Sequence, residues 1–119
     1  MKPEYKFLDN FRYAREGFLA VFKSEKSFRI EIFFFVLLSI VAIFLPVSLF
    51  KKIILISSMM LPLVVELVNS AIERIVDVMY KDYNENAKYI KDSAAAAVMI
   101  SLFVPTSIWI GVLMSLLGY

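Results

Sequence analysis

Four polar side chains follow a long apolar run in the middle of the chain, and their types and spacing could support chemistry. The stretch from Ile53 to Val65 carries no charge, and after it come Glu66, Asn69, Glu73 and Asp77. At 100° per residue these four side chains fall within an arc of roughly 80° on one helix face and climb roughly 16 Å along it. Ionised carboxylates are costly in hydrocarbon and usually mark function there. The stripe therefore needs a functional explanation.

The chemistry that this stripe indicates is phosphoryl transfer to an alcohol. Two carboxylates near water can hold Mg²⁺ against nucleotide phosphates, while a deeper one accepts the proton of an attacking hydroxyl. Glu66 is the deepest of the four, near the level at which a lipid presents its hydroxyl. Glu25 and Glu31 add carboxylates on the same side, and Lys91 adds a cation for the γ-phosphate. The chain has no histidine and no cysteine, so acid–base work falls to carboxylates, Lys or Tyr.

The same residues also fit plainer roles when each is taken alone. Glu73 and Asp77 fit a solvated helix end, and Lys91 fits a basic residue that reaches for the membrane interface. A carboxylate stripe would also suit the pore of a small channel or assembly subunit. Such a cation path needs the stripe but no phosphate-binding lysine, so the joint presence of Glu25, Glu66, Glu73 and Lys91 favours an enzyme.

The composition places these residues in a membrane protein. Of 119 residues, 61% are hydrophobic, which is more apolar surface than such a short chain can hide from water. The length predicts one domain, residues 1–119. A net charge of only +2 gives no indication of nucleic acid as a partner.

The hydrophobic pattern predicts an all-α membrane protein with an amphipathic surface helix and three transmembrane helices. Phe7, Phe11, Phe18 and Phe22 recur at helical spacing among charged residues, as in a helix that lies flat at the interface. The later apolar runs are long enough to cross a hydrocarbon core. The surface helix is expected at about 5–26, and the spans at about 28–50, 53–79 and 92–117.

Individual residues refine this arrangement. Pro46 predicts a turn between the first two spans, and Pro62 predicts a kink in the second. Trp109 and Tyr119 are expected as anchors at the outer interface. Seven Lys or Arg residues precede Ile32, whereas the turn after Pro46 has two and the C-terminal end none. The positive-inside rule then places the N-terminus in the cytoplasm.

Several of these segments resemble the signature of the prokaryotic diacylglycerol kinase family. The strongest match is residues 66–73 (ELVNSAIE), with Val76-Asp77 and Lys91-Asp92 after it, and residues 12–17 (RYAREG) and 25–31 (EKSFRIE) before it. The resemblance implies a lipid kinase of a bacterial inner membrane that uses ATP and Mg²⁺. It also implies a homotrimer of three-span protomers, with active sites between neighbouring protomers.

Carried over position by position, the resemblance assigns a role to each matching residue. It implies Glu66 as the catalytic base, with Asn69 as a polar partner, and Glu25 and Glu73 as ligands of the Mg²⁺ that accompanies ATP. The positions that it implies around the nucleotide are Lys6, Tyr13, Asp82, Tyr83, Asn84, Lys91 and Asp92.

The resemblance leaves two lipid acceptors open, diacylglycerol and undecaprenol, since both present a primary hydroxyl at the membrane surface. Glu31 and Ser70 look more like diacylglycerol kinases and favour that acceptor. Asp9 and Glu16 stand where basic residues are expected, and Ala95 stands where the best-known members have Ser. Ala95 is therefore expected to serve packing.

Overall fold

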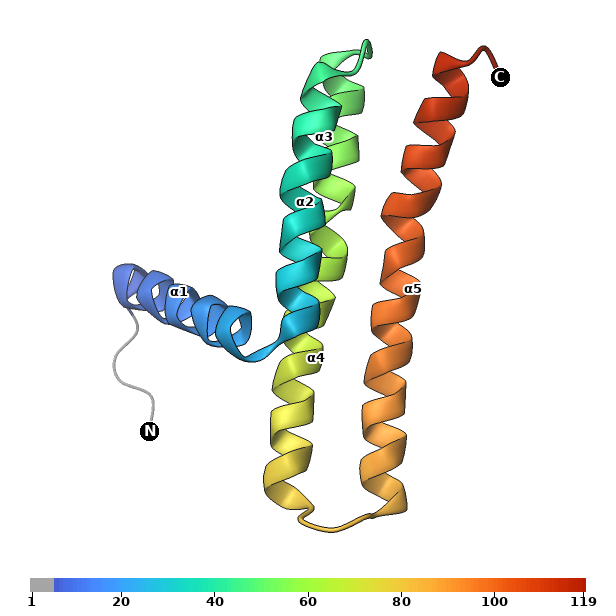
Figure 1. Ribbon diagram of the computed structural model, residues 1–119. Coiled ribbons are helices and arrows are strands. Elements are labelled where there is room, and N and C mark those ends of the chain that lie inside the picture. Colours follow the sequence, from blue (N-terminus) through green and yellow to red (C-terminus); the bar gives the residue numbers. More distant parts are fainter. Residues whose placement is uncertain (1–5) are drawn as a thin grey trace.

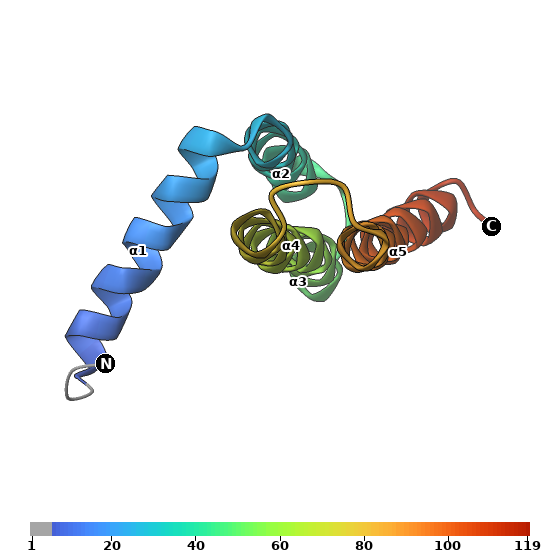
Figure 2. The same ribbon diagram turned by 90° about the horizontal axis from the view of Figure 1, so that it is seen from below.

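The computed structural model describes residues 6–119, and these form helices with no strand among them (Figure 1). Helices α2 to α5 stand side by side as an elongated bundle, and α1 extends from its flank (Figures 1 and 2). The predicted all-α membrane fold with a helix lying outside the spans is confirmed. The helices are α1 (Phe7–Ser24), α2 (Lys26–Phe44), α3 (Leu49–Ser58), α4 (Met60–Met79) and α5 (Glu85–Leu116).

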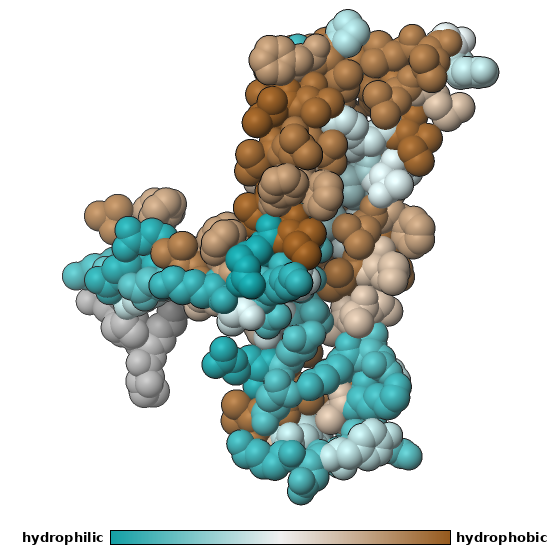
Figure 3. Space-filling model, viewed as in Figure 1, coloured by the Kyte–Doolittle hydropathy of each residue, from teal (hydrophilic) through white to brown (hydrophobic). Residues whose placement is uncertain are grey.

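Three helical stretches are long and apolar enough to cross a membrane, namely α2, the pair α3–α4 and α5. The pair α3–α4 covers 31 residues and α5 covers 32. At about 1.5 Å per residue both exceed a hydrocarbon core of roughly 30 Å, so one end of each must project from it. Figure 3 shows that end: polar residues gather over the lower ends of α4 and α5, and apolar residues cover the bundle above.

A sharp corner separates the surface helix from the first span. Glu25 takes an extended backbone conformation and ends α1. The Arg29 guanidinium donates through Nη1 to the carbonyls of Phe22 and Lys23, at 2.8 and 2.9 Å. These carbonyls belong to the last turn of α1, where a helix leaves its acceptors open. The corner turns α1 away from the bundle, and none of its side chains is buried.

The turn after the first span lies where Pro46 predicted it, although α2 ends earlier than the expected span. Ser48 starts the next helix by accepting the Lys51 backbone N–H on its Oγ at 3.2 Å. The Lys52 ammonium donates back to the Ile43 carbonyl at 2.6 Å and satisfies the end of α2. Both lysines therefore belong to the first turn of α3.

The second span is interrupted at Met59, which separates α3 from α4. Pro62 follows three residues later, and a proline in a helix removes one N–H donor and crowds the preceding turn. The Met59 N–H donates to the Ile56 carbonyl at 3.2 Å, so the Leu55 carbonyl loses its regular helical partner. The helix is thus interrupted one turn before Pro62, in the part of the span where a kink was expected.

Helix α4 occupies the centre of the arrangement and positions the polar stripe. It packs along α5 and also contacts α1, α2 and α3. Few large side chains are fully buried within one chain, chiefly Phe28 and Leu55, and many large apolar side chains on α2 to α5 are exposed. Lipid or another chain must cover that surface.

Candidate active site

The predicted stripe of Glu66, Asn69, Glu73 and Asp77 on α4 runs from the buried interior of the bundle to its exposed polar end. Glu66 and Asn69 are only 7% and 8% exposed. One and two turns further on, Glu73 is half-buried and Asp77 is exposed. The structure therefore has the predicted gradient, with the deepest carboxylate also the most enclosed.

Glu66 is joined to the first span by a hydrogen bond that the sequence did not predict. The Ser27 hydroxyl, in the first turn of α2, donates to Glu66 Oε1 at 3.1 Å. This bond links residues 39 positions apart, and periodicity within one helix gives no signal for such a pair. A carboxylate has about four acceptor sites, so Glu66 retains capacity to accept the proton of an alcohol.

The two carboxylates expected to hold Mg²⁺ lie on the same side of α4. The Ser70 hydroxyl donates to Glu25 Oε1 at 3.5 Å, and Asn69 Nδ2 donates to Glu73 Oε1 at 3.1 Å. Ser70 and Glu73 are three residues apart and are therefore neighbours on the helix surface. The corner at Glu25 thus brings that carboxylate within about one helical turn of Glu73.

This pair fits Mg²⁺ in the form in which the ion accompanies a nucleotide. Residues 6–119 contain no group of three or more acidic, His or Cys side chains that could hold a metal by themselves. Nucleotide-bound Mg²⁺ needs only one or two protein carboxylates, because phosphates and water complete its shell. Asn69 Oδ1 adds a buried oxygen that lacks a hydrogen-bond partner. Oxygen donors without imidazole or thiolate suit a hard cation.

A polar hollow of about 480 Å³ lies where α4 ends and α5 begins. Five of the residues expected around the nucleotide line it together with Asp77, Tyr80, Lys81 and Lys88. The structure thus brings these predicted residues to one place: Asp82, Tyr83, Asn84, Lys91 and Asp92.

Two ion pairs hold the cations and carboxylates of this hollow. Lys91 Nζ lies 2.6 Å from Asp77 Oδ1 and joins α5 to α4, and Lys88 pairs with Asp92 within α5. All four side chains are more than two-fifths exposed. Exposed pairs of this kind contribute roughly 0–1 kcal/mol, so an incoming phosphate can replace Asp77 at Lys91 at little cost.

Asn84 caps a helix, a structural role that was not predicted from the sequence. Its Oδ1 accepts the backbone N–H groups of Asn86 and Ala87 at 2.8 and 3.3 Å and caps the start of α5. Helix α5 therefore begins seven residues before the expected third span. An Asn followed by Glu85 at the start of a helix was the signal available for this boundary.

Two predicted residues lie apart from the others in a single chain. Lys6 immediately precedes α1 and Tyr13 lies in its first half. That half extends away from the bundle (Figures 1 and 2). The Tyr13 ring packs instead beneath the guanidinium of its neighbour Arg12, whose Cζ lies 5.3 Å from the ring centroid.

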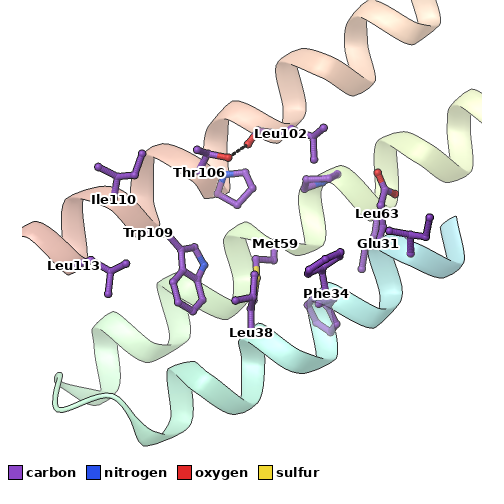
Figure 4. A pocket seen from close by; sticks show the side chains of 14 residues that line it. Glu31, Phe34, Leu38, Met59, Leu63, Leu102, Thr106, Trp109, Ile110 and Leu113 are labelled. Atoms are coloured by element: carbon purple, nitrogen blue, oxygen red, sulfur yellow. Dashed lines mark hydrogen bonds between the residues drawn. The ribbon is translucent and has the colours of Figure 1, made fainter. Parts of the chain in front are cut away.

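An apolar groove of about 480 Å³ lies on the membrane side of Glu66, between α2, the pair α3–α4 and α5 (Figure 4). This volume is within the roughly 300–1,000 Å³ typical of small-molecule sites. Glu31 lies at one end of the groove, and its Oε2 is buried without a hydrogen-bond partner. Glu31 follows Ser27 by four residues on α2, so it lies one turn deeper on the same face. The groove thus ends next to the Ser27–Glu66 bond.

The prediction that Trp109 anchors the outer interface is wrong. The indole is half-buried and lines the groove (Figure 4). Its Nε1 donates to the Leu55 carbonyl at 3.3 Å. The packing of α5 against α3 decides that this side chain points inward, and the sequence of one helix does not show that packing.

The comparisons with known proteins agree with this arrangement of residues. Residues 12–113 match the family described as prokaryotic diacylglycerol kinase. The chain belongs to that family. The resemblance predicted from the sequence is confirmed, and every predicted site residue of the family signature except Lys6 lies within the matched range.

Relatives within the prokaryotic diacylglycerol kinase family are similar over most of their length, and each is named diacylglycerol kinase. The Escherichia coli (strain K12) protein is 37% identical over 106 residues, which cover 89% of this chain and 87% of the relative. The Haemophilus influenzae protein is 33% identical over 106 residues, covering 89% and 90%. The Pseudomonas aeruginosa protein is 38% identical over 102 residues, covering 86% and 83%.

Proposed function

We propose that this protein transfers the γ-phosphate of ATP to the primary hydroxyl of diacylglycerol and so produces phosphatidic acid. Family membership supports a membrane lipid kinase, and the names of the relatives support diacylglycerol as the acceptor. The observation that carries the proposal is the position of Glu66. This buried carboxylate lies between the polar hollow and the apolar groove, where a nucleotide from water and an alcohol from the membrane would meet.

In this proposal Glu66 is the general base. It accepts the proton of the acceptor hydroxyl as that oxygen bonds to the γ-phosphorus, and the bond from phosphorus to the β–γ bridging oxygen breaks to release ADP. Ser27 is a positioning residue, because its hydroxyl holds Glu66 Oε1. A well-placed general base contributes about 10²–10⁴ to the rate.

Glu25 and Glu73 are proposed to hold the Mg²⁺ that accompanies ATP. The ion would neutralise charge on the phosphates when bound. Asn69 orients Glu73 by donating to its Oε1 and keeps its own Oδ1 free of protein partners. Lys91 and Asp92 are proposed to contact the nucleotide, together with Asp82, Tyr83 and Asn84, which line the same hollow.

Lys6 and Tyr13 are proposed to reach the nucleotide from a neighbouring chain in a homotrimer. This proposal is supported by the outward course of α1 and by the many large apolar side chains left exposed on α4 and α5. Native mass spectrometry of the protein released from nanodiscs should detect three chains. A monomer as the active species would remove the proposed contribution of the surface helix.

We place the N-terminus and the 80–84 connection in the cytoplasm of a bacterial inner membrane, where ATP is available. The chain has no cysteine, so single cysteines can report the topology. With a membrane-impermeant maleimide, Tyr83→Cys should label only after lysis of the inner membrane. Ser48→Cys, in the turn at the opposite end of the bundle, should label in spheroplasts, and the reverse pattern would invert the topology.

The acceptor is tested by supplying purified lipids with magnesium and [γ-³²P]ATP to the protein in bilayers. Diacylglycerol should be labelled in preference to undecaprenol, and Glu66→Gln protein serves as the inactive control. Equal or faster labelling of undecaprenol would overturn the choice of acceptor but would still support a lipid kinase activity. Labelling of no membrane alcohol would overturn the proposed activity itself.

A further inference from the structure

The break in the second span creates an acceptor that α5 uses. Because the Met59 N–H is engaged with the Ile56 carbonyl, the Leu55 carbonyl lacks its regular backbone donor and can accept hydrogen bonds from side chains. The Ser58 hydroxyl donates to it at 2.9 Å, and Trp109 Nε1 donates to it from α5 at 3.3 Å. The Trp109 indole is therefore fixed by a hydrogen bond as well as by packing.

The position of this indole along the groove follows from the pairing of the helices. α4 and α5 run antiparallel, and the pair of Asp77 with Lys91 sets their register. Eleven residues back along α4 from Asp77 is Glu66, and eleven residues forward along α5 from Lys91 is Leu102, so these two lie at the same level. Eighteen residues from the pair in the same directions lie Met59 and Trp109, which also share a level. The distance along α5 from Leu102 to Trp109 is roughly 10 Å, and the distance to the last groove residue on α5, Leu113, is roughly 16 Å.

We propose that Trp109 determines which lipid chain lengths the protein accepts, an inference that rests on the proposed lipid kinase activity. One hydrocarbon chain of the acceptor occupies the groove, with the headgroup at the end marked by Glu31. Two observations select this occupant. The lining is apolar except at Glu31 and Thr106, and the Glu31 end adjoins the candidate active site at Glu66 and Ser27.

Discrimination in this groove comes from fit rather than from the hydrophobic effect. Bilayer hydrocarbon is as apolar as the groove wall, so a chain gains nothing merely by leaving the lipid. A chain that extends more than roughly 10 Å beyond the reaction level reaches the fixed indole, which forms part of the groove wall there, and has to pack past it, bend out or displace it. Overpacking of this kind is destabilising, whereas shorter chains fit below the ring.

The first test compares kcat/KM for diacylglycerols from dihexanoyl- to distearoylglycerol. Trp109→Ala should raise the ratio of long-chain to short-chain kcat/KM by about fivefold or more, because it relieves the overpacking. Phe103→Ala is the matched control, since Phe103 is an exposed apolar residue of α5 that does not line the groove. An unchanged ratio in Trp109→Ala, or the same change in Phe103→Ala, would overturn the inference.

Trp109→Phe provides a second variant that keeps an aromatic ring but lacks the N–H donor. We expect a change in the same direction as for alanine but smaller, because the ring remains and is no longer fixed to Leu55. A ratio that stays at the wild-type value in both variants contradicts a role for the indole. This comparison remains informative if the alanine variant does not fold.

A binding measurement separates this inference from the kinase activity. Trp109 is the only tryptophan of the chain, so its fluorescence reports on the groove without ATP. A diacylglycerol with bromine midway along one chain should quench it saturably, and unlabelled diacylglycerol should restore it better than phosphatidylcholine with the same chains. Equal restoration by both lipids would overturn occupancy of the groove. Saturable quenching without any phosphorylation would support the groove and refute only the proposed activity.

Discussion

The substitution Glu66→Gln tests the central claim about the site, that a buried carboxylate acts as the base. Glutamine has nearly the same shape, and its carbonyl oxygen can still accept the Ser27 hydroxyl that now donates to Glu66 Oε1 at 3.1 Å. The contact between α2 and α4 is therefore retained, and the ability to accept a proton is lost. A neutral amide is also cheaper to bury than a carboxylate at a position that is 7% exposed.

The expected loss follows from the role of a general base. Turnover should fall by about 10²–10⁴, which corresponds to roughly 3–5 kcal/mol of activation free energy. The KM for ATP should hardly change, because Glu66 lies roughly 16 Å along α4 from the polar hollow at Asp77. Thermal stability should be equal to that of the wild type or higher.

The assay is transfer of ³²P from ATP to diacylglycerol in bilayers, with nucleotide binding and thermal unfolding measured on the same preparation. Ser27→Ala serves as the control. Loss of one hydrogen bond to a retained base should raise the activation free energy by about 1 kcal/mol, which lowers turnover about fivefold. Wild-type turnover in Glu66→Gln would refute the role of base. A joint loss of stability and nucleotide binding would instead identify Glu66 as a packing residue.

Five further substitutions test the rest of the site. Glu73→Gln and Glu25→Gln should each raise the magnesium concentration needed for half-maximal turnover at saturating ATP. An unchanged magnesium dependence would contradict the proposed role of these carboxylates as Mg²⁺ ligands. Lys91→Ala should strongly raise the KM for ATP, because it removes the cation proposed to contact the nucleotide. Asp77→Asn should leave activity largely intact and change the free energy of unfolding by no more than roughly 1 kcal/mol, because the pair is exposed. Equal loss of activity in both variants would show that the ion pair matters rather than the charge of Lys91. Asn84→Ala should destabilise the protein by about 1 kcal/mol through the start of α5, which thermal unfolding would detect, and an unchanged transition would contradict its role as a cap.

The residues that carry strong local signals were predicted well. The apolar runs, the stripe from Glu66 to Asp77 and the interruption of the second span before Pro62 follow from periodicity and from the backbone chemistry of proline. The family signature made the choice of residues specific. Helix limits were predicted less closely, because capping by Ser48 and Asn84 shifts the starts of α3 and α5 by several residues.

Pairs between distant segments could not be predicted in the same way. Ser27 meets Glu66 because α2 packs against α4, and Ser70 meets Glu25 because the corner between α1 and α2 places Glu25 beside α4. Trp109 shows the same limit, since the packing of α5 against α3 decides that its indole points inward to the Leu55 carbonyl.

The sequence by itself determined that the protein is a helical membrane protein, which face of α4 is polar and which family it belongs to, because each of these depends on local spacing or on residue identity. The tertiary structure alone decided which side chains share the site, how the groove joins it and where the indole is held. These depend on the register and rotation of packed helices, which no single helix specifies.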